Sequence, residues 1–239
     1  SVGRVVDLLE SFDVTHPTRT MRELQLSTGL PKTTVLRLVS TLVARGVLSQ
    51  RREGEFTLGP ELLRWSRLAG QVWTPSPEVV AVMRRLSEQT GETANLYARQ
   101  GLSRVVVAQA ESSSTVRSVV PLGVPFPLGT GAASKVLLLD HPELVDEAAT
   151  RSGDATTAEQ LRADVEACRQ RGHQLSHGER EQGASGLSFP VRGRHGDVVA
   201  ALTLGGPTGR FTEERLPTYI SATRAAALEV EQLGLPGLD

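Results

Sequence analysis

Residues 30–46 constrain the fold of this chain more than any other stretch, because they read as one helix with defined ends. Pro31 suits the first helical position, where its missing N–H costs nothing, and Gly46 suits the stop just past the last apolar residue. Apolar residues recur between these ends at helical spacing, and we expect four of them to face inward: Leu36, Val39, Leu42 and Val43. The opposite face carries Lys32, Thr33, Thr34 and Arg37.

A shorter helix is predicted just before this stretch, over residues 22–28, with its end at Gly29. Thr20 can cap it, and Glu23 three residues later completes a capping box. Two helices joined by a short turn that contains Gly predict a helix-turn-helix whose second helix reads DNA. Short hydroxyl groups suit phosphates, and Arg37 can form two hydrogen bonds to guanine. The alternative is an ordinary amphipathic surface helix.

Residues 47–59 extend this unit with two strand-like runs around a Glu-Gly turn, which predicts a hairpin, or wing. Residues 19–52 hold seven basic residues against the single acid Glu23, although the whole chain has a net charge of −1. A basic patch on a near-neutral chain favours binding to nucleic acid. The residues predicted to contact double-stranded operator DNA are Arg22, Lys32, Thr33, Thr34, Arg37, Arg51 and Arg52.

The composition allows two modest domains, since the chain has 239 residues of which 39% are hydrophobic. Cys168 is the single cysteine, so no internal disulfide can form, and a reducing cytoplasm fits. No apolar run approaches the roughly 18 residues that a membrane span needs. The first residues lack the basic start and apolar core of a signal peptide. A cytoplasmic protein without membrane contact is therefore expected.

A linker helix is predicted from Pro60 to about residue 72, and Pro75 and Pro77 follow it. Its apolar residues are Leu62, Leu63, Trp65, Leu68, Ala69 and Val72, with Trp73 at its end. They could pack on their own domain or pair with the same helix of a second copy. Because helix-turn-helix proteins usually read two half-sites, we favour a homodimer or a dimer of dimers. The predicted domains are residues 1–59, the linker helix 60–75, and residues 76–239.

The rest of the chain alternates strand-like and helical patterns, which predicts a mixed α/β sensor domain and an α+β protein as a whole. Strands are expected over residues 92–100, 103–111, 115–120, 187–192 and 197–205. Helices are expected over residues 78–90, 143–149 and 158–171, from the Gly-rich loop 121–134 to about residue 139, and from a cap at Thr212 to about residue 233.

Three patterns in this second domain could indicate catalysis, but each lacks a required partner. Residues 129–134 resemble a dinucleotide loop without its third Gly or a parallel βαβ unit. Cys168 and His173 could form a nucleophile–base pair, although a lone helical Cys usually packs in a core. His173, His177 and Glu179 lack the setting of a metal site. We therefore expect no enzyme, metal or cofactor; the competing classes are a small-molecule-binding enzyme and an interaction scaffold.

The same loop suits a ligand-binding role better. Small residues at a helix start leave backbone N–H groups open, and the helix dipole favours an anion there. Residues Thr130, Gly131, Ala132, Ala133 and Ser134 could thus cradle a carboxylate. The alternative is that Gly and Ala only permit close packing of the helix on a sheet.

Residues 19–59, with Leu-Pro-Lys-Thr-Thr-Val-x-Arg-Leu and Phe-x-Leu-Gly, resemble the winged helix-turn-helix of the IclR family of bacterial transcriptional regulators. Residues 128–135, 172–191 and 199–207 resemble the family's later motifs, so the resemblance spans essentially the whole chain. It implies a GAF-like effector-binding domain and a ligand-responsive regulator. We expect a repressor that responds to a small, carboxylate-bearing metabolite, with an activator as the alternative.

The resemblance also implies which residues line the effector pocket: Ser118, Leu128, Ala132, Ala133, Ser176, Ala184, Gly186, Thr203 and Gly205. The chain departs from the family pattern at Ser134, where Gly is usual, at Ser176, where an acid is frequent, and at Gly186, where Cys or Ser is frequent. We therefore expect a roomier and less polar pocket, with apolar walls added by Leu122, Val124, Phe126 and Phe189.

Overall fold

The computed structural model describes residues 2–51, 54–153 and 156–238. The chain forms two compact units that divide between Val72 and Trp73, at the end of the predicted linker helix. The elements of the first unit are α1 Val2–Glu10, β1 Thr18–Thr20, α2 Met21–Thr28, α3 Lys32–Ala44, β2 Leu48–Gln50, β3 Glu55–Leu58 and α4 Glu61–Trp73, which ends one residue past the division.

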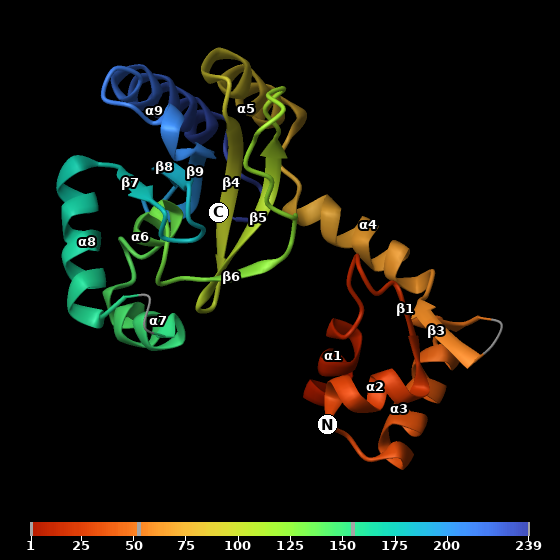
Figure 1. The fold of residues 1–239 in the computed structure, drawn as a ribbon. Coiled ribbons are helices and arrows are strands. Elements are labelled where there is room, and N and C mark those ends of the chain that lie inside the picture. Colours follow the sequence, from red (N-terminus) through yellow and green to blue (C-terminus); the bar gives the residue numbers. More distant parts are fainter. Residues whose placement is uncertain (1, 52–53, 154–155, 239) are drawn as a thin grey trace. The chain divides into compact units, whose positions relative to one another are not determined.

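The first unit is the predicted helix-turn-helix with its wing (Figure 1). Strands β2 and β3 form the expected hairpin, and β1, which was expected to be part of a loop, pairs with β3 on its other side. The three helices and the sheet enclose one apolar core that includes Leu8, Leu24, Val39 and Phe56. Helix α4 begins where predicted, and none of its residues is buried.

The ends of α2 follow the predicted chemistry. The hydroxyl of Thr20 accepts the backbone N–H of Glu23, whose carboxylate accepts the backbone N–H of Thr20 at 2.7 Å. Gly29 closes the helix in the left-handed region, with φ of 64°. The capping box and the Gly stop are therefore confirmed, and together they satisfy backbone groups that a helix end leaves open.

The inward face of α3 differs from the prediction by one position. Val35, Val39 and Leu42 are buried, whereas Leu36 is 52% exposed and Val43 is half-buried. Residues 35, 39 and 42 follow the i, i+4, i+7 spacing of a helix face, and Leu36 lies on its flank. Pro31 is the N-cap rather than the first helical residue.

The second unit places six antiparallel strands in the order β6-β5-β4-β9-β8-β7. Its elements are α5 Pro77–Thr90, β4 Thr93–Gln100, β5 Ser103–Ala110, β6 Pro125–Pro127, α6 Ala132–Leu137, η2 Pro142–Leu144, α7 Val145–Arg151, α8 Ala158–Arg171, β7 Gln174–His177, β8 Ala184–Arg192, β9 Val198–Pro207, η4 Thr208–Arg210 and α9 Leu216–Leu233.

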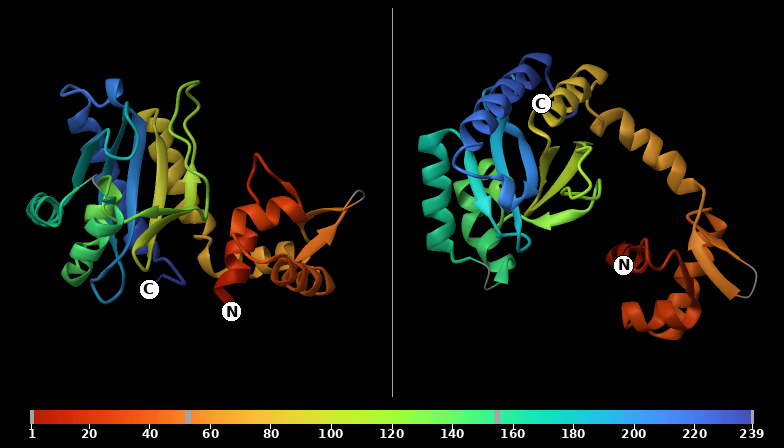
Figure 2. Two further views of the ribbon diagram at one scale, coloured as in Figure 1. Left: turned by 60° about the horizontal axis from the view of Figure 1, so that its bottom comes forward. Right: turned by 45° about the horizontal axis from the view of Figure 1, so that its top comes forward.

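Helices cover both faces of this sheet. Helices α5 and α9 lie together on one face, and α6, α7 and α8 lie on the other (Figures 1 and 2). Side chains alternate between the two cores along a strand, so that Leu96 of β4 packs toward α5 and α9 while Tyr97 packs toward α6. The alternation matters for function, because the α6 face of β4 and β5 borders the cavity described below.

Several boundaries differ from the sequence prediction. Residues 115–120 form no strand; the edge of the sheet beside β5 is occupied instead by β6, which pairs Arg104 with Phe126. Helix α6 stops at Leu137. Thr212 does not cap α9, which begins at Leu216 with Arg215 as its N-cap. The carbonyl oxygen of Thr212 instead accepts the N–H groups of Arg215 and Leu216 in the turn that leads into the helix. Strand β7 was not predicted.

Gly59 gives a test of the packing between wing and linker helix. A Cβ at this position would overlap the carbonyl oxygen of Gly46, which accepts the N–H of Glu61. We expect Gly59→Ala to destabilise the first unit by about 1–3 kcal/mol, because backbone atoms must shift. The matched control is Gly3→Ala in α1, where a Cβ meets nothing within 4 Å and should be neutral or stabilising. Calorimetric unfolding of the full chain measures both, and equal midpoints would contradict the expectation.

Candidate functional site

The outer face of α3 presents the residues predicted to contact DNA. Lys32, Thr33 and Arg37 are exposed and Thr34 is half-buried, on the side of the helix away from Val35 and Val39. Neither Lys32 nor Arg37 forms a side-chain hydrogen bond or ion pair within the described residues. Their charges are therefore available to an outside partner.

The other predicted contacts lie on α2 and the wing. Arg22 is exposed on α2, and Arg51 is exposed directly after β2. Arg52 lies outside the described residues. Arg19 has a structural task instead, since its Nε donates to the carbonyl oxygen of Ser11 at 2.9 Å. Contact of these residues with DNA stays a prediction.

The second unit contains a cavity with about 450 Å³ of empty space, part of it open to solvent. Eight of the nine predicted pocket residues border it: Ser118, Ala132, Ala133, Ser176, Ala184, Gly186, Thr203 and Gly205. The ninth, Leu128, is fully buried in the apolar core under α6 and does not reach the cavity. The remaining lining residues are Tyr97, Arg104, Gly131, Glu179, Arg180 and Ser185. Effector binding by these residues stays a prediction.

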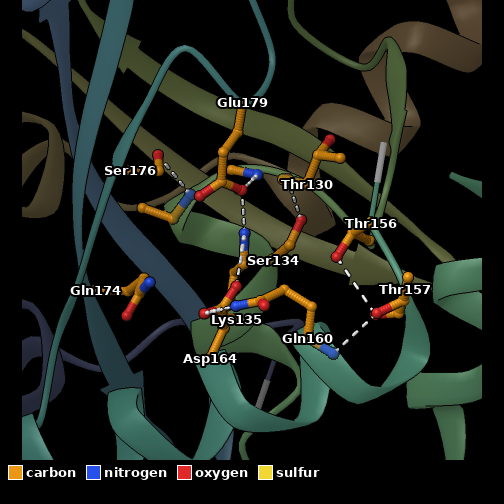
Figure 3. Close-up of polar contacts among 12 residues, drawn as sticks. Thr130, Ser134, Lys135, Thr156, Thr157, Gln160, Asp164, Gln174, Ser176 and Glu179 are labelled. Atoms are coloured by element: carbon orange, nitrogen blue, oxygen red, sulfur yellow. Dashed lines mark hydrogen bonds and ion pairs between the residues drawn. The ribbon is translucent and has the colours of Figure 1, made fainter. Parts of the chain in front are cut away.

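Glu179 ties the loop between β7 and β8 to the start of α6. One oxygen of its carboxylate accepts both the backbone N–H of Gly131, at 2.8 Å, and the Nζ of Lys135. Lys135 is 1% exposed, and its Nζ lies between Glu179 and Asp164, as Figure 3 shows. The ammonium group is therefore removed from water, whereas the side chain of Glu179 is 31% exposed.

The predicted carboxylate cradle at residues 130–134 is already occupied by the chain's own groups. Gly131 donates its N–H to Glu179, and Ala132 donates its N–H to the hydroxyl of Ser176 at 3.0 Å. An incoming anion would have to displace these acceptors. Ser176, where the family frequently has an acid, thus uses its hydroxyl to hold the start of α6.

Arg104 of β5 is the most unusual residue of the cavity wall. It is 2% exposed, and its Nη1 donates to the carbonyl oxygen of Pro127 and to Ser134 Oγ. Burial, with the nearby charge of Arg180, lowers the pKa of Arg104 to about 10, so the group stays protonated at neutral pH. A charged guanidinium thus borders the cavity, and its buried Nε has no hydrogen-bond partner among the described residues.

Arg180, from the loop after β7, adds a second guanidinium. Its Cζ lies 5.7 Å from the centre of the Phe126 ring, and that of Arg104 lies 5.9 Å from the same ring. Arg180 Nη2 also donates to Ser118 Oγ at 3.4 Å. The sequence analysis did not name these two charged side chains. Arg104 occupies an inward position of a strand that the sequence had located correctly.

None of the four predicted apolar wall residues lines the cavity, although the ring of Phe126 lies beside the two arginines that do. Leu122 and Val124 are exposed, and neither borders the cavity. Phe189 stacks on His173, with ring centres 5.1 Å apart, at a different hollow beside α9.

The residues of the patterns that could have indicated catalysis are buried or bound to neighbouring side chains. Cys168 is fully buried in the core, and burial raises its pKa to about 11, which disfavours a thiolate. His177 Nδ1 lies 2.7 Å from Ser185 Oγ, and Glu179 pairs with Lys135. In the parts of the chain that the structure describes, no three His, Cys, Asp or Glu side chains are grouped to hold a metal ion.

Two family models match the chain. The model for the IclR helix-turn-helix domain matches residues 1–52, and the model for the C-terminal part of the bacterial transcriptional regulator IclR matches residues 78–232. The chain belongs to the IclR family.

Relatives and solved structures agree with this membership. The transcriptional regulator KipR of Bacillus subtilis is 30% identical, over 97% of this chain and 96% of KipR. The transcriptional repressor AllR of Escherichia coli is 28% identical, over 98% of this chain and 90% of AllR. A crystal structure of an IclR-family regulator from Rhodococcus sp. is 64% identical, with a TM-score of 0.70 over 100% of this chain and 94% of that one.

This IclR-family protein is a DNA-binding transcriptional regulator, not an enzyme, and its C-terminal domain binds a small-molecule effector. The α+β architecture, with a winged helix-turn-helix and a mixed sensor domain, is confirmed. No described helix is long and apolar enough to cross a membrane.

The Lys135–Glu179 pair gives a test of what holds the pocket together. We expect Glu179→Gln to lower the free energy of unfolding by about 2–3 kcal/mol, because the buried Lys135 then has only Asp164 nearby, at 4.0 Å. Lys135→Met should lower it by less, because the side chain of Glu179 is 31% exposed and water can hydrate its charge. The double variant should lose less than the sum of the two, since neither charge then remains. Chemical denaturation followed by circular dichroism measures the cycle. Arg162→Met, which breaks an exposed pair with Asp146, should change stability by less than about 1 kcal/mol. Additive single effects would show that the pair is not coupled.

Proposed function

We propose that this regulator is a homodimeric repressor that binds operator DNA and responds to a small carboxylate-bearing metabolite. The observation that carries the effector class is Arg104, a buried cation that faces the cavity.

The partners of the buried charges support the proposal that the effector carries a carboxylate. The structure describes three charged residues that are almost fully buried: Glu92, Arg104 and Lys135. Glu92 accepts two hydrogen bonds from Arg210, at 2.6 and 2.7 Å, and Lys135 pairs with Glu179. Arg104 forms no ion pair within the described residues. The charge of Glu179 raises the pKa of Arg104, but burial outweighs this effect. Since a partly compensated buried charge is costly, an anionic ligand at this guanidinium would be favoured. The planar fork of Arg suits a carboxylate.

Recognition of DNA is proposed to use the free cations of the first unit. Arg37 projects from the middle of the outer face of α3, where it can reach a guanine edge. Lys32, Thr33 and Thr34 lie in the first turn of the same helix and suit phosphates or neighbouring bases. Arg22, Arg51 and Arg52 are proposed to contact the phosphate backbone.

The homodimer is proposed to form through α4. Trp65, Leu68 and Val72 follow the i, i+3, i+7 spacing, so they share one stripe of the helix, and all three are exposed. An exposed apolar stripe favours a protein contact. Two copies joined in this way would present two recognition helices to the half-sites of a pseudo-palindromic operator.

Repression is the direction of control that we propose, with activation as the alternative. The 28% identical relative AllR is named a repressor. An effector can change operator affinity only through different affinities for two conformations of the protein. Transcription from the native promoter, with and without the protein, separates the two: repression requires less transcript when the protein is present.

Arg37→Ala and Arg51→Ala test the proposed interface. Fluorescence anisotropy on the native upstream duplex and a scrambled duplex, at two salt concentrations, should show tighter, salt-sensitive binding to the native duplex. Arg37→Ala should reduce the preference for the native duplex by about 1–3 kcal/mol. Arg51→Ala should weaken both duplexes alike and flatten the salt dependence. Equal binding of both duplexes by the unmodified protein would refute operator recognition.

Leu68→Glu tests the proposed dimer. A carboxylate in the middle of the apolar stripe would be buried without a partner, so the variant should be monomeric at concentrations at which the unmodified protein is a dimer. Arg67→Glu places the same charge on the far side of α4 and should leave the dimer intact. Sedimentation velocity measures both masses. A dimeric Leu68→Glu variant would place the dimer contact elsewhere.

A further inference from the structure

Two guanidinium groups converge on the cavity, from separate parts of the chain. Arg104 is held from β5 by Pro127 and Ser134, and Arg180 reaches in from the loop after β7. Both lie within 6 Å of the centre of the Phe126 ring. The ring attracts both cations but does not neutralise them, since a cation–π contact leaves the charge in place.

No acid forms an ion pair with Arg104 within the described residues, although Glu179 is close enough for its charge to raise the pKa of Arg104. The carboxylate of Glu179 is already bound by Lys135 and by the N–H of Gly131. Arg180 lies 3.6 Å from Glu181, but that side chain is 72% exposed. Water screens such an exposed pair, so it compensates little of the charge of Arg180. Asp164 lies beside Lys135, on the side away from Glu179.

Apart from Tyr97 and Glu179, the rest of the wall consists of small residues. The wall includes the hydroxyl groups of Ser118, Ser176 and Thr203. It also includes Gly186 and Gly205, which have no side chain. A Cβ on either glycine would meet neighbouring atoms at 3.4 to 3.8 Å, which is ordinary van der Waals contact. The cavity, with about 450 Å³ of empty space that includes open solvent, suits a small ligand.

We infer that the effector is a short dianion, such as a short-chain dicarboxylate, with one carboxylate at Arg104 and the other at Arg180. This inference rests on the proposed carboxylate-binding function of the same pocket and adds the number of charges. Arg104 is the inner anchor, because it is buried and fixed by Ser134. Arg180 is the outer anchor that distinguishes two carboxylates from one. The hydroxyl groups between them suit a hydroxyl or keto group on the ligand.

Isothermal titration calorimetry of the full-length protein with matched pairs of probes tests this inference. Succinate is compared with butyrate, and malate with 3-hydroxybutyrate, so that each pair differs by one carboxylate in place of a methyl group. We expect the dicarboxylate of at least one pair to bind about tenfold more tightly or better, since a second charge-assisted contact contributes that much.

Variants assign the two anchors. Arg180→Gln should bring the dicarboxylate down to the affinity of its monocarboxylate, and Arg104→Gln should abolish binding of both. Arg162→Gln on α8, an exposed arginine outside the cavity, should change neither. Arg180 is partly exposed, so its variant is expected to fold, and thermal unfolding without ligand checks both pocket variants.

The outcomes separate the two levels of the proposal. Equal affinity within both pairs would overturn the dianion while leaving a carboxylate effector in place. Binding of none of the four probes would overturn the short dianion and remove the support for a carboxylate effector. Operator affinity, measured in the same preparations, reports on the DNA-binding part of the proposed function independently of either result.

Discussion

The sensor domain depends on one ion pair, between the buried Lys135 of α6 and Glu179 of the loop after β7, whose side chain is partly exposed. A lysine that is 1% exposed must have a counter-charge, because removing an ammonium group from water costs several kcal/mol. Glu179 supplies it and also accepts the N–H of Gly131, so the loop is bound to the start of α6 at two points. The same loop carries Arg180. The position of that guanidinium at the cavity therefore follows from the pairing of its neighbour.

Two kinds of buried charge thus coexist in one domain. Glu92 pairs with Arg210, and Lys135 pairs with Glu179, so each of these buried charges has a partner of opposite sign within the chain. These pairs serve stability and geometry. The hydrogen bonds of Arg104 are satisfied only in part. Its Nη1 has two acceptors, but its Nε has none in the described chain, and no carboxylate forms an ion pair with it. A ligand gains most binding free energy at a buried charge of this kind, because binding removes a desolvation penalty that is already present in the free protein.

Much of the fold could be predicted from local patterns. The capping box at Thr20 and Glu23, the Gly stop after α2 and the hairpin of the wing depend on residues close in sequence. The long helices and the central strands followed their periodicity equally well. The errors arose where distant segments compete. Residues 115–120 have strand-like composition but lose the edge of the sheet to β6, and Leu36 lies outside the core because Val35 takes its place.

The sequence by itself determined the helix-turn-helix, the concentration of basic residues on it and the small residues that line the cavity, because these follow from spacing, charge and local backbone preference. Only the tertiary structure decided the charge of the pocket. Arg104 and Arg180 are separated by 75 intervening residues, and neither belongs to a pattern that marks a site. Pairing of β5 with β4 and β6, and the Lys135–Glu179 contact, bring them to one aromatic ring. Which charges are buried, and which lack a partner, is a property of the packed chain rather than of its letters.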